Sequence, residues 1–123
     1  MEAKINEIEI NGEKYVKASD VKQLATPLDG KPYCIVRTYS SGVFAGYVES
    51  REGQEVVLVN ARRIWKWEGA ASLSQLATSG TSQPAKCMFP EPVARVTLLQ
   101  AIEIIDCTEV GKKSIEGVSI WKK

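Results

Sequence analysis

The stretch YCIVRTYSSGVFAGYVESREGQEVVLVNARRIWKW, residues 33–67, decides the fold of this chain. It is rich in the β-branched and aromatic residues that favour strands, and two turn sequences interrupt it, Ser-Ser-Gly at 40–42 and Ser-Arg-Glu-Gly at 50–53. Two turns at this spacing predict a three-stranded antiparallel meander. Asn60 breaks the apolar pattern of the third strand, so we expect a bulge or kink near Asn60 and Ala61 that re-aims the side chains after it.

A hairpin is predicted before the meander. Asn11 and Gly12 both tolerate the positive φ that a type I′ turn requires, and this turn would place Ile8 opposite Tyr15. Ser19 has the chemistry of a helix N-cap, which predicts a short helix over 20–25 that ends before Pro27. We therefore expect two parts.

The first part, residues 1–27, is the hairpin with its helix, either as an arm or as part of the domain. The second part, residues 32–123, is the main antiparallel sheet domain. With 123 residues, 44% hydrophobic and 25% charged, the chain has the length and composition of one soluble globular domain.

The residues after the meander predict short helices and further strands. Ser72 and Gln75 have the spacing of a capping box, which predicts a helix over about 72–78 that ends at Gly80. Three prolines then predict an irregular surface loop over 78–92.

Residues 93–107 fit either one buried helix or two strands around a kink, and their β-branched content favours strands. Thr108 is expected to cap a final helical turn ending at Gly117, with a short edge strand over 118–121. The expected fold is therefore α+β: an antiparallel β-sheet meander with two or three short helices in a single compact domain.

The charge and the residue types that are missing narrow the function. The net charge is +1, so a field from the whole molecule cannot drive binding to nucleic acid or to an anionic membrane. The chain has no histidine, which excludes zinc hydrolases and catalytic triads that use this residue. Three widely separated cysteines argue against a disulfide framework, fit a reducing compartment, and are expected to be buried or half-buried thiols.

No apolar run approaches the ~20 residues that span a bilayer, and the first ten residues lack the pattern of a signal peptide. We expect the cytoplasm as the location. No pair of carboxylates stands out at a spacing suited to acid–base catalysis, and Cys34 lies in an apolar stretch that would keep its thiol inert. We therefore expect no enzymatic activity, no metal site and no cofactor.

The segment NARRIWKWEGAASLS, residues 60–74, is the richest in groups that bind anions and flat rings. Its cationic and aromatic members stand next to the predicted helix start, and they are Arg62, Arg63, Trp65, Lys66 and Trp67. Guanidinium groups hold phosphate and indole faces stack on bases. On a strand, positions 63, 65 and 67 fall on one face and positions 62, 64 and 66 on the other. The alternative is a core face whose rim is charged.

Two weaker candidates lie elsewhere. In residues 37–46 a Gly/Ser turn lies next to Arg37 and Tyr39 and could present backbone N–H groups to an anion, although Gly42 and Gly46 would equally serve turn geometry or close strand packing. The Ser/Thr cluster at 78–82 has the composition of a phosphate loop without the Walker spacing or its lysine, and a solvated loop is the alternative.

The strings PYCIVRTYSSGVFAGYVESREGQEVVLVNARRIWKWEGAASLSQLA and IEGVSIW resemble a family of short, uncharacterised proteins encoded by bacteriophages and prophages. The resemblance covers most of residues 32–121 and brings no assigned activity. It implies a small phage protein made in the cytoplasm of a bacterial host, which either is carried in the virion or acts on the host.

These observations lead to one preferred hypothesis and two alternatives. The preferred one is a non-enzymatic accessory protein that binds a small nucleotide-like ligand or a host protein, in counter-defence or host takeover. The alternatives are a virion component that assembles as a homo-oligomer, and a nucleic-acid-binding protein, which the near-neutral charge disfavours. The residues expected to bind the ligand are Arg62, Arg63, Trp65, Trp67, Arg37, Tyr39 and Ser72.

Overall fold

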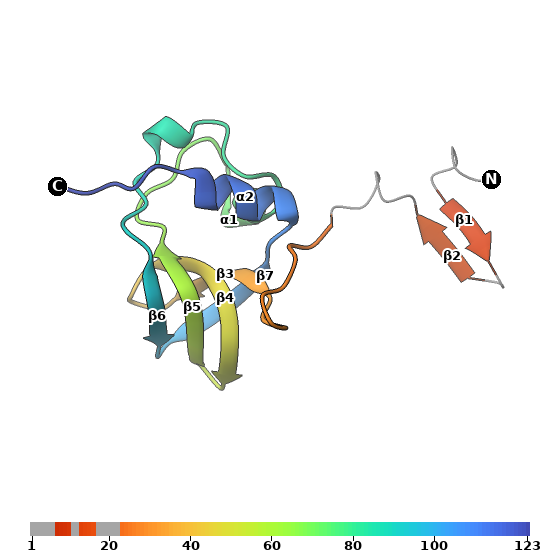
Figure 1. The fold of residues 1–123 in the computed structure, drawn as a ribbon, viewed down its shortest axis with the longest axis horizontal. Coiled ribbons are helices and arrows are strands. Elements are labelled where there is room, and N and C mark those ends of the chain that lie inside the picture. Colours follow the sequence, from red (N-terminus) through yellow and green to blue (C-terminus); the bar gives the residue numbers. More distant parts are fainter. Residues whose placement is uncertain (1–6, 11–12, 17–22) are drawn as a thin grey trace.

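The computed structural model describes residues 7–10, 13–16 and 23–123 of the chain. Its main part is α+β and mostly β, with one open antiparallel sheet of five strands and two helices that lie together beside it (Figure 1). The helix count is therefore two in the described part, at the lower end of the two or three expected. The additional helical element there is a single 3-10 turn, Pro84–Lys86.

The predicted meander is confirmed. Strands β3 (Tyr33–Thr38), β4 (Val43–Glu52) and β5 (Glu55–Arg63) follow one another in the chain and pair antiparallel. The second turn is shorter than predicted, because β4 continues through residues 50–52 and Glu52 pairs with Glu55. Gly53 has a φ of 61°, which allows the chain to reverse within two residues.

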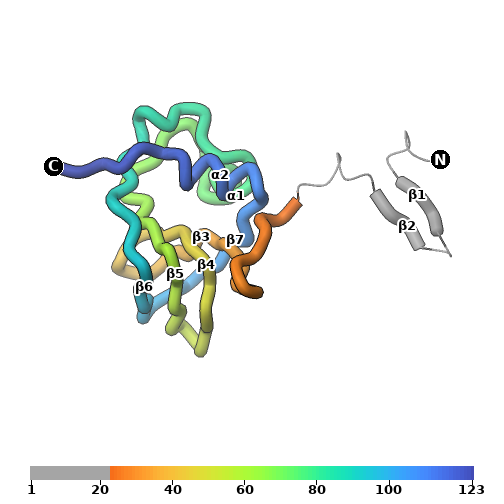
Figure 2. Tube along the Cα trace, viewed as in Figure 1, coloured from red at the N-terminus to blue at the C-terminus, as the bar shows by residue number. Residues whose placement is uncertain are grey.

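Residues 93–107 form two strands, as favoured, but these strands do not pair with each other. β6 (Val93–Leu98) pairs with β5 and β7 (Ala101–Asp106) pairs with β3, so the order across the sheet is β6-β5-β4-β3-β7. In a flat sheet of five strands the two edge strands would lie about 19 Å apart. Three Cα–Cα steps, from Leu98 to Ala101, reach at most about 11 Å. The sheet must therefore coil enough to bring the end of β6 close to the start of β7 at one corner, where Figure 2 traces the chain from β6 to β7.

Both faces of the coiled sheet are packed. Ile35 and its neighbours on one face pack against the two helices and Phe89 in one apolar cluster. Val36 points to the opposite face and packs in a second cluster that includes Phe44 and Leu98. Because successive side chains of a strand alternate between faces, the helix-covered face and the enclosed face share the same strands.

Helices α1 (Leu73–Ser79) and α2 (Glu109–Gly117) begin at the two predicted caps. The hydroxyl of Ser72 accepts a hydrogen bond from the backbone N–H of Gln75 at 3.1 Å. The Gln75 side chain accepts from the N–H of Ala71 rather than from that of Ser72, so the capping box is displaced by one residue. Thr108 caps α2 by accepting from the N–H of Gly111 at 3.0 Å.

Three sequence-based expectations need correction. Residues 23–25 are not helical: Leu24 forms an isolated bridge with Thr108, and the N–H of Ala25 donates to the carbonyl of Cys107 at 2.9 Å. These backbone groups bond to the end of β7 instead of to a helical turn, and the remainder of the expected helix, with Ser19, lies outside the described residues. Residues 118–121 form no strand, because only a single bridge links Ile120 to Phe89.

The third correction concerns residues 78–92, which are not merely a surface loop. Phe89 is fully buried in the cluster beneath the helices, and Cys87 is buried with it. The irregular backbone was predicted correctly, but the surface placement was wrong for Cys87 and Phe89, because the three prolines say nothing about which side chains turn inward.

The predicted hairpin is also present. β1 (Glu7–Ile10) and β2 (Glu13–Val16) pair antiparallel with Ile8 opposite Tyr15. The turn residues Asn11 and Gly12 lie outside the described residues.

Candidate functional site

A β-bulge at Asn60 determines where the two arginines of β5 point. Tyr47 pairs with Val59 and Ala45 with Arg62, so Gly46 alone faces two residues of β5. Asn60 has a φ of 52°, in the left-handed region. A Cβ on Gly46 would lie 3.0 Å from the Cα of Ala61, so a side chain here would require the backbone of the bulge to shift. The extra residue shifts the alternation by one, as expected for a bulge.

The shift places Arg62 on the helix-covered face, where it is only 4% exposed. Its guanidinium donates three hydrogen bonds to backbone carbonyls: Nη1 to Ile115 at 2.9 Å, Nη2 to Phe89 at 3.2 Å and Nε to Pro90 at 3.2 Å. Burial lowers the pKa of Arg62, while the nearby Tyr33 acts in the opposite direction. Arg62 therefore joins β5 to the end of α2 and is not part of a surface shared with Arg63.

Arg63 points to the opposite face and is exposed. Its guanidinium carbon lies 4.3 Å from the centroid of the Phe44 ring, and Nη1 donates to the carbonyl oxygen of Ser41. These two contacts hold the cation beside the turn between β3 and β4. The turn and the arginine, which come from two separate sequence candidates, are thus brought together.

The two tryptophans lie beside this cation. Trp65 is 63% exposed, whereas Trp67 is half-buried and donates from Nε1 to the carbonyl of Ala70 at 3.2 Å. The backbone here is fixed, because the N–H of Trp65 donates to the carbonyl of Met88 and Met88 donates back to that of Lys66. Together these residues border a hollow of about 250 Å³, here named the indole hollow, which is lined by Ser40, Ser41, Gly42, Val43, Arg63, Ile64, Trp65 and Trp67.

The other predicted site residues lie apart from the indole hollow or only at its edge. Arg37 forms an ion pair with Glu103 across β3 and β7, with Nε 3.0 Å from Oε1. The hydroxyl of Ser72 is used as the helix cap. Tyr39 is 77% exposed and directly precedes the serines of the hollow. The Ser/Thr cluster at 78–82 ties loops together, since the Thr81 hydroxyl donates to the carbonyl of Glu68.

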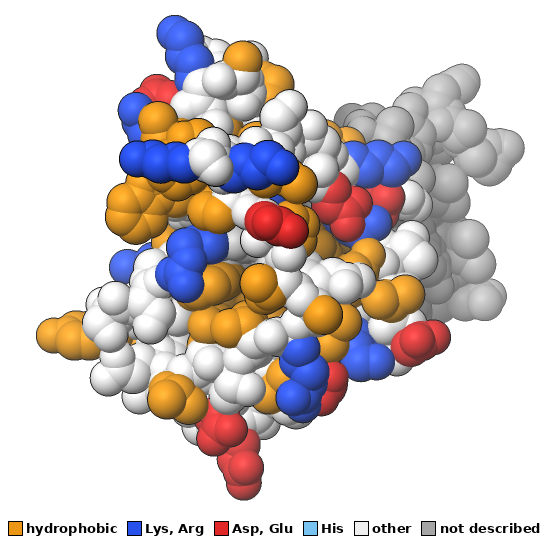
Figure 3. All heavy atoms as spheres, turned by 60° about the vertical axis from the view of Figure 1, so that its left-hand side comes forward, with side chains coloured by type: hydrophobic (Ala, Val, Ile, Leu, Met, Phe, Trp, Pro, Cys, Tyr) orange, Lys and Arg blue, Asp and Glu red, His pale blue; other side chains and the backbone are white. Residues whose placement is uncertain are grey.

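One face of the molecule mixes apolar and basic side chains. On the side of the molecule shown in Figure 3, hydrophobic side chains and lysines or arginines lie next to one another, without a continuous basic band. This distribution agrees with the net charge of +1. Neither observation favours a long polyanion, which binds through many cationic contacts.

A second cavity was missed by the sequence reasoning. It has a volume of about 340 Å³, lies on the helix-covered face, and is lined by Tyr33, Asn60, Arg62, Pro92 and Glu116. The bulge expected at Asn60 was the one available signal, since bulges often stand next to functional sites. The sequence could not show that Tyr33 and Glu116 come to the same place, because 83 positions of chain separate them.

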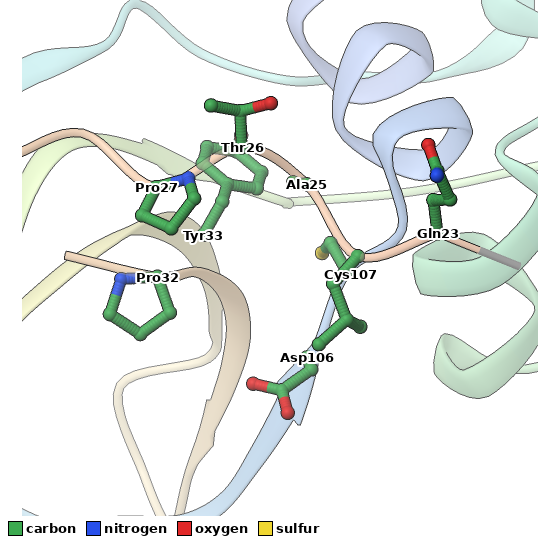
Figure 4. A pocket seen from close by; sticks show the side chains of 9 residues that line it. Gln23, Ala25, Thr26, Pro27, Pro32, Tyr33, Asp106 and Cys107 are labelled. Carbon is green, nitrogen blue, oxygen red and sulfur yellow. The ribbon is translucent and has the colours of Figure 1, made fainter. Parts of the chain in front are cut away.

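A third hollow is lined by both a carboxylate and a thiol. It measures about 430 Å³ and lies where residues 23–27 pass the start of β3 and the end of β7. In Figure 4 Pro27, Pro32 and Tyr33 border one side of it, and Asp106 and Cys107 the other. Oδ1 of Asp106 accepts a hydrogen bond from the Cys34 thiol at 3.2 Å.

The thiols near this hollow are held in the protonated form. Burial raises the pKa of Cys107 to about 12 and raises that of Cys34 further, with the Asp106 carboxylate adding to the effect on Cys34. A thiol is nucleophilic only as the thiolate, so neither group is activated. All three cysteines are buried and free, as predicted.

Comparison with known proteins gives a family but no activity. No helix in residues 23–123 or the described hairpin is both long enough and apolar enough to cross a membrane. No curated protein and no solved structure matches the chain. Residues 31–115, which include the whole five-stranded sheet and most of α2, match a domain of unknown function, DUF6948. The chain belongs to the DUF6948 family.

Proposed function

We propose that the protein is a non-enzymatic binding protein that holds a flat, negatively charged, nucleotide-like ligand at the indole hollow. The observation that carries this proposal is the exposed indole of Trp65 beside the fixed cation of Arg63. An indole that served only as core filler would be enclosed. Trp65 is instead mostly exposed at the edge of a hollow, next to a group of the kind that pairs with phosphate.

The size of the hollow limits how the ligand is held. Sites that enclose a whole small molecule usually measure about 300–1,000 Å³, and the indole hollow has about 250 Å³. One ring of the ligand would enter it and the remainder would lie on the surface near Tyr39. Stacking on an indole contributes about 1–3 kcal/mol per base. We therefore expect weak binding, with Kd between about 10 μM and 1 mM.

The test is a panel of mono-, di- and cyclic nucleotides followed by tryptophan fluorescence and by the melting temperature. A true ligand quenches Trp65 fluorescence and raises Tm, because it binds only the folded protein. Trp65→Ala and Arg63→Gln should each weaken binding. Their matched controls are Trp121→Ala, outside the hollow, and Arg51→Gln, at the tip of β4. If no nucleotide changes Tm or fluorescence, or if the controls weaken binding equally, the proposal fails.

A host protein is the second candidate, favoured by a different observation. Tyr39, Trp65 and Leu99 are large, apolar and strongly exposed, and aromatic residues of this kind often dominate protein interfaces. A host protein captured by the wild type should be lost with Trp65→Ala and with Tyr39→Ala. A partner that both variants retain would contradict this candidate.

The remaining expectations stay predictions. The family resemblance is the basis for expecting a bacteriophage protein that acts in counter-defence or host takeover, either in the bacterial cytoplasm or in the virion. General arguments about small sheet domains are the basis for expecting a homo-oligomer. Mass spectrometry of purified particles tests the virion, and light scattering on the pure protein tests self-association. For nucleic acid, the burial of Arg62 removes one of the two cations expected to contact phosphates, and a binding affinity that does not change with salt would exclude it.

A further inference from the structure

The cavity behind the bulge is a polar site distinct from the indole hollow. Its five lining residues come from β3, β5, the segment before β6, and α2, and none of them lines the indole hollow. With about 340 Å³ it falls within the range of small-molecule sites. Two of its polar side chains, Arg62 and Tyr33, are more than nine-tenths buried.

Arg62 brings a buried positive charge to this cavity. A guanidinium has five N–H donors, and the carbonyls of Phe89, Pro90 and Ile115 receive three hydrogen bonds from it. No carboxylate of the described residues forms an ion pair with it. Buried charges are normally paired, because desolvation of a lone ion is unfavourable. The hydrogen bonds to three backbone carbonyls fix the orientation of the guanidinium group. Its remaining N–H donors are suited to an anion.

Tyr33 adds a second buried donor. Its side chain is 3% exposed, and its hydroxyl forms no hydrogen bond with any residue in the described ranges 7–10, 13–16 and 23–123. Burial raises the pKa of Tyr33 strongly, and the charge of Glu116 raises it further, so the phenol keeps its proton and can donate it in a hydrogen bond. A buried hydroxyl without a partner is uncommon and points to a missing one.

The remaining lining groups define the other end of the ligand. Glu116 is half-exposed at the cavity and lies 3.6 Å from the ammonium of Lys112, measured between Nζ and Oε1. Its carboxylate accepts hydrogen bonds and repels a second strong negative charge. Asn60, fixed by the bulge, offers an amide that both donates and accepts.

We propose that this cavity binds a small carboxylate that carries a hydrogen-bond donor on the adjacent carbon, that is, an α-hydroxy or α-amino acid. Arg62 and Tyr33 donate to the carboxylate, and Glu116 accepts from the hydroxyl or ammonium group. Phosphate fits less well, because its nearly double negative charge would lie close to Glu116. The site is independent of the indole hollow and does not rest on nucleotide binding there.

The experiment is an NMR titration of the whole ¹⁵N-labelled protein with L-lactate, L-alanine, acetate, ethylamine and inorganic phosphate. L-lactate or L-alanine should give saturable shifts in the amides of Asn60, Arg62 and Glu116 in the millimolar range. Acetate should bind more weakly, and ethylamine should not bind. Tighter binding of phosphate, equal binding of ethylamine, or no saturable shift would overturn the proposal.

Variants with matched controls locate the binding. Tyr33→Phe should weaken binding about tenfold, because one hydrogen bond to a charged group is lost. Tyr47→Phe should not, since Tyr47 packs edge-on against Tyr33 but does not line the cavity. Glu116→Gln should abolish the preference for L-alanine over acetate, and Glu103→Gln should leave it. Trp65→Ala, which removes the indole hollow, should leave lactate binding unchanged. Equal affinity in wild type and Tyr33→Phe would contradict the site.

Discussion

Two glycines of α2 differ in what surrounds them. A Cβ on Gly111 would lie 1.9 Å from the carbonyl oxygen of Ala77 in α1, whereas one on Gly117 would meet nothing within 4 Å. The helices can therefore approach as closely as they do only because position 111 has no side chain. The same approach supports Thr108, whose hydroxyl contacts both helices.

Gly111→Ala should lower the free energy of unfolding by about 3 kcal/mol or more, because the two helices must separate to admit the methyl group. Gly117→Ala is the matched control in the same helix. It should leave the free energy of unfolding unchanged or raise it by up to about 1 kcal/mol. Urea unfolding followed by circular dichroism measures both. A loss of equal size in the two variants would show that the close approach is not the cause.

Asn60 adopts a left-handed backbone conformation that few residue types tolerate. Because its φ of 52° is tolerated by glycine and strained for most other residues, Asn60→Ala should lower the free energy of unfolding by about 1 kcal/mol. Asn60→Gly should be nearly neutral, since glycine adopts this φ freely. Thermal unfolding of the two variants distinguishes them. If the glycine variant is the less stable, the strain argument fails.

At the scale of the elements, the two helix caps contribute unequally. Ser72 is exposed and makes one capping bond. Thr108 is buried, accepts from Gly111 and donates to the carbonyl of Thr78 at 2.7 Å, so one hydroxyl starts α2 and fastens it to α1.

Ser72→Ala should therefore lower the free energy of unfolding by about 1 kcal/mol. Thr108→Val, which keeps the shape but loses the hydroxyl, should lower the free energy of unfolding by about 2–3 kcal/mol, because a buried N–H and a partly buried carbonyl lose their partner. Thr108→Ser should retain most of the stability. Chemical denaturation gives the three values, and equal losses for Ser72→Ala and Thr108→Val would contradict this account.

The elements that could be predicted are those set by neighbouring residues. The meander, the bulge at Asn60 and both helix starts follow from turns, caps and alternation within a few residues. The positions of β6 and β7 on opposite edges could not be predicted, since strand patterns do not name their partners. The alternation of side chains after Asn60 could be predicted from the sequence. Which face of the sheet the helices cover could not, because that depends on contacts between distant segments. That choice decides which of the two arginines, Arg62 or Arg63, is buried.

At the scale of the whole molecule, the buried weak acids make stability depend on pH. The pKa values of Cys34, Cys107 and Tyr33 are all raised in the folded protein, chiefly by burial. Below the ordinary thiol value of 9.0 both states hold these protons, and the stabilisation is fully present. As the pH rises further the unfolded chain loses protons that the folded protein keeps, so the folded protein becomes less stable.

The free energy of unfolding should accordingly fall above pH 9, with a slope of about 1.4 kcal/mol per pH unit for each buried thiol. Urea unfolding at a series of alkaline pH values measures the slope. Cys34→Ala should reduce this slope by the contribution of one thiol, and it should also lower the free energy of unfolding at neutral pH. A stability that stays flat up to pH 11 would contradict the burial of these groups.

The pairing of β3 with β7 has a consequence for how the chain is made. Cys34 and Asp106 lie 72 positions apart and still face each other across that pair. On the ribosome β3 emerges long before β7 has been synthesised, so one side of β3 waits with its backbone groups unpaired. Such an open edge can join to other nascent chains. Completion of the sheet therefore waits until β7 has been synthesised, and we expect a chain truncated before residue 101 to aggregate.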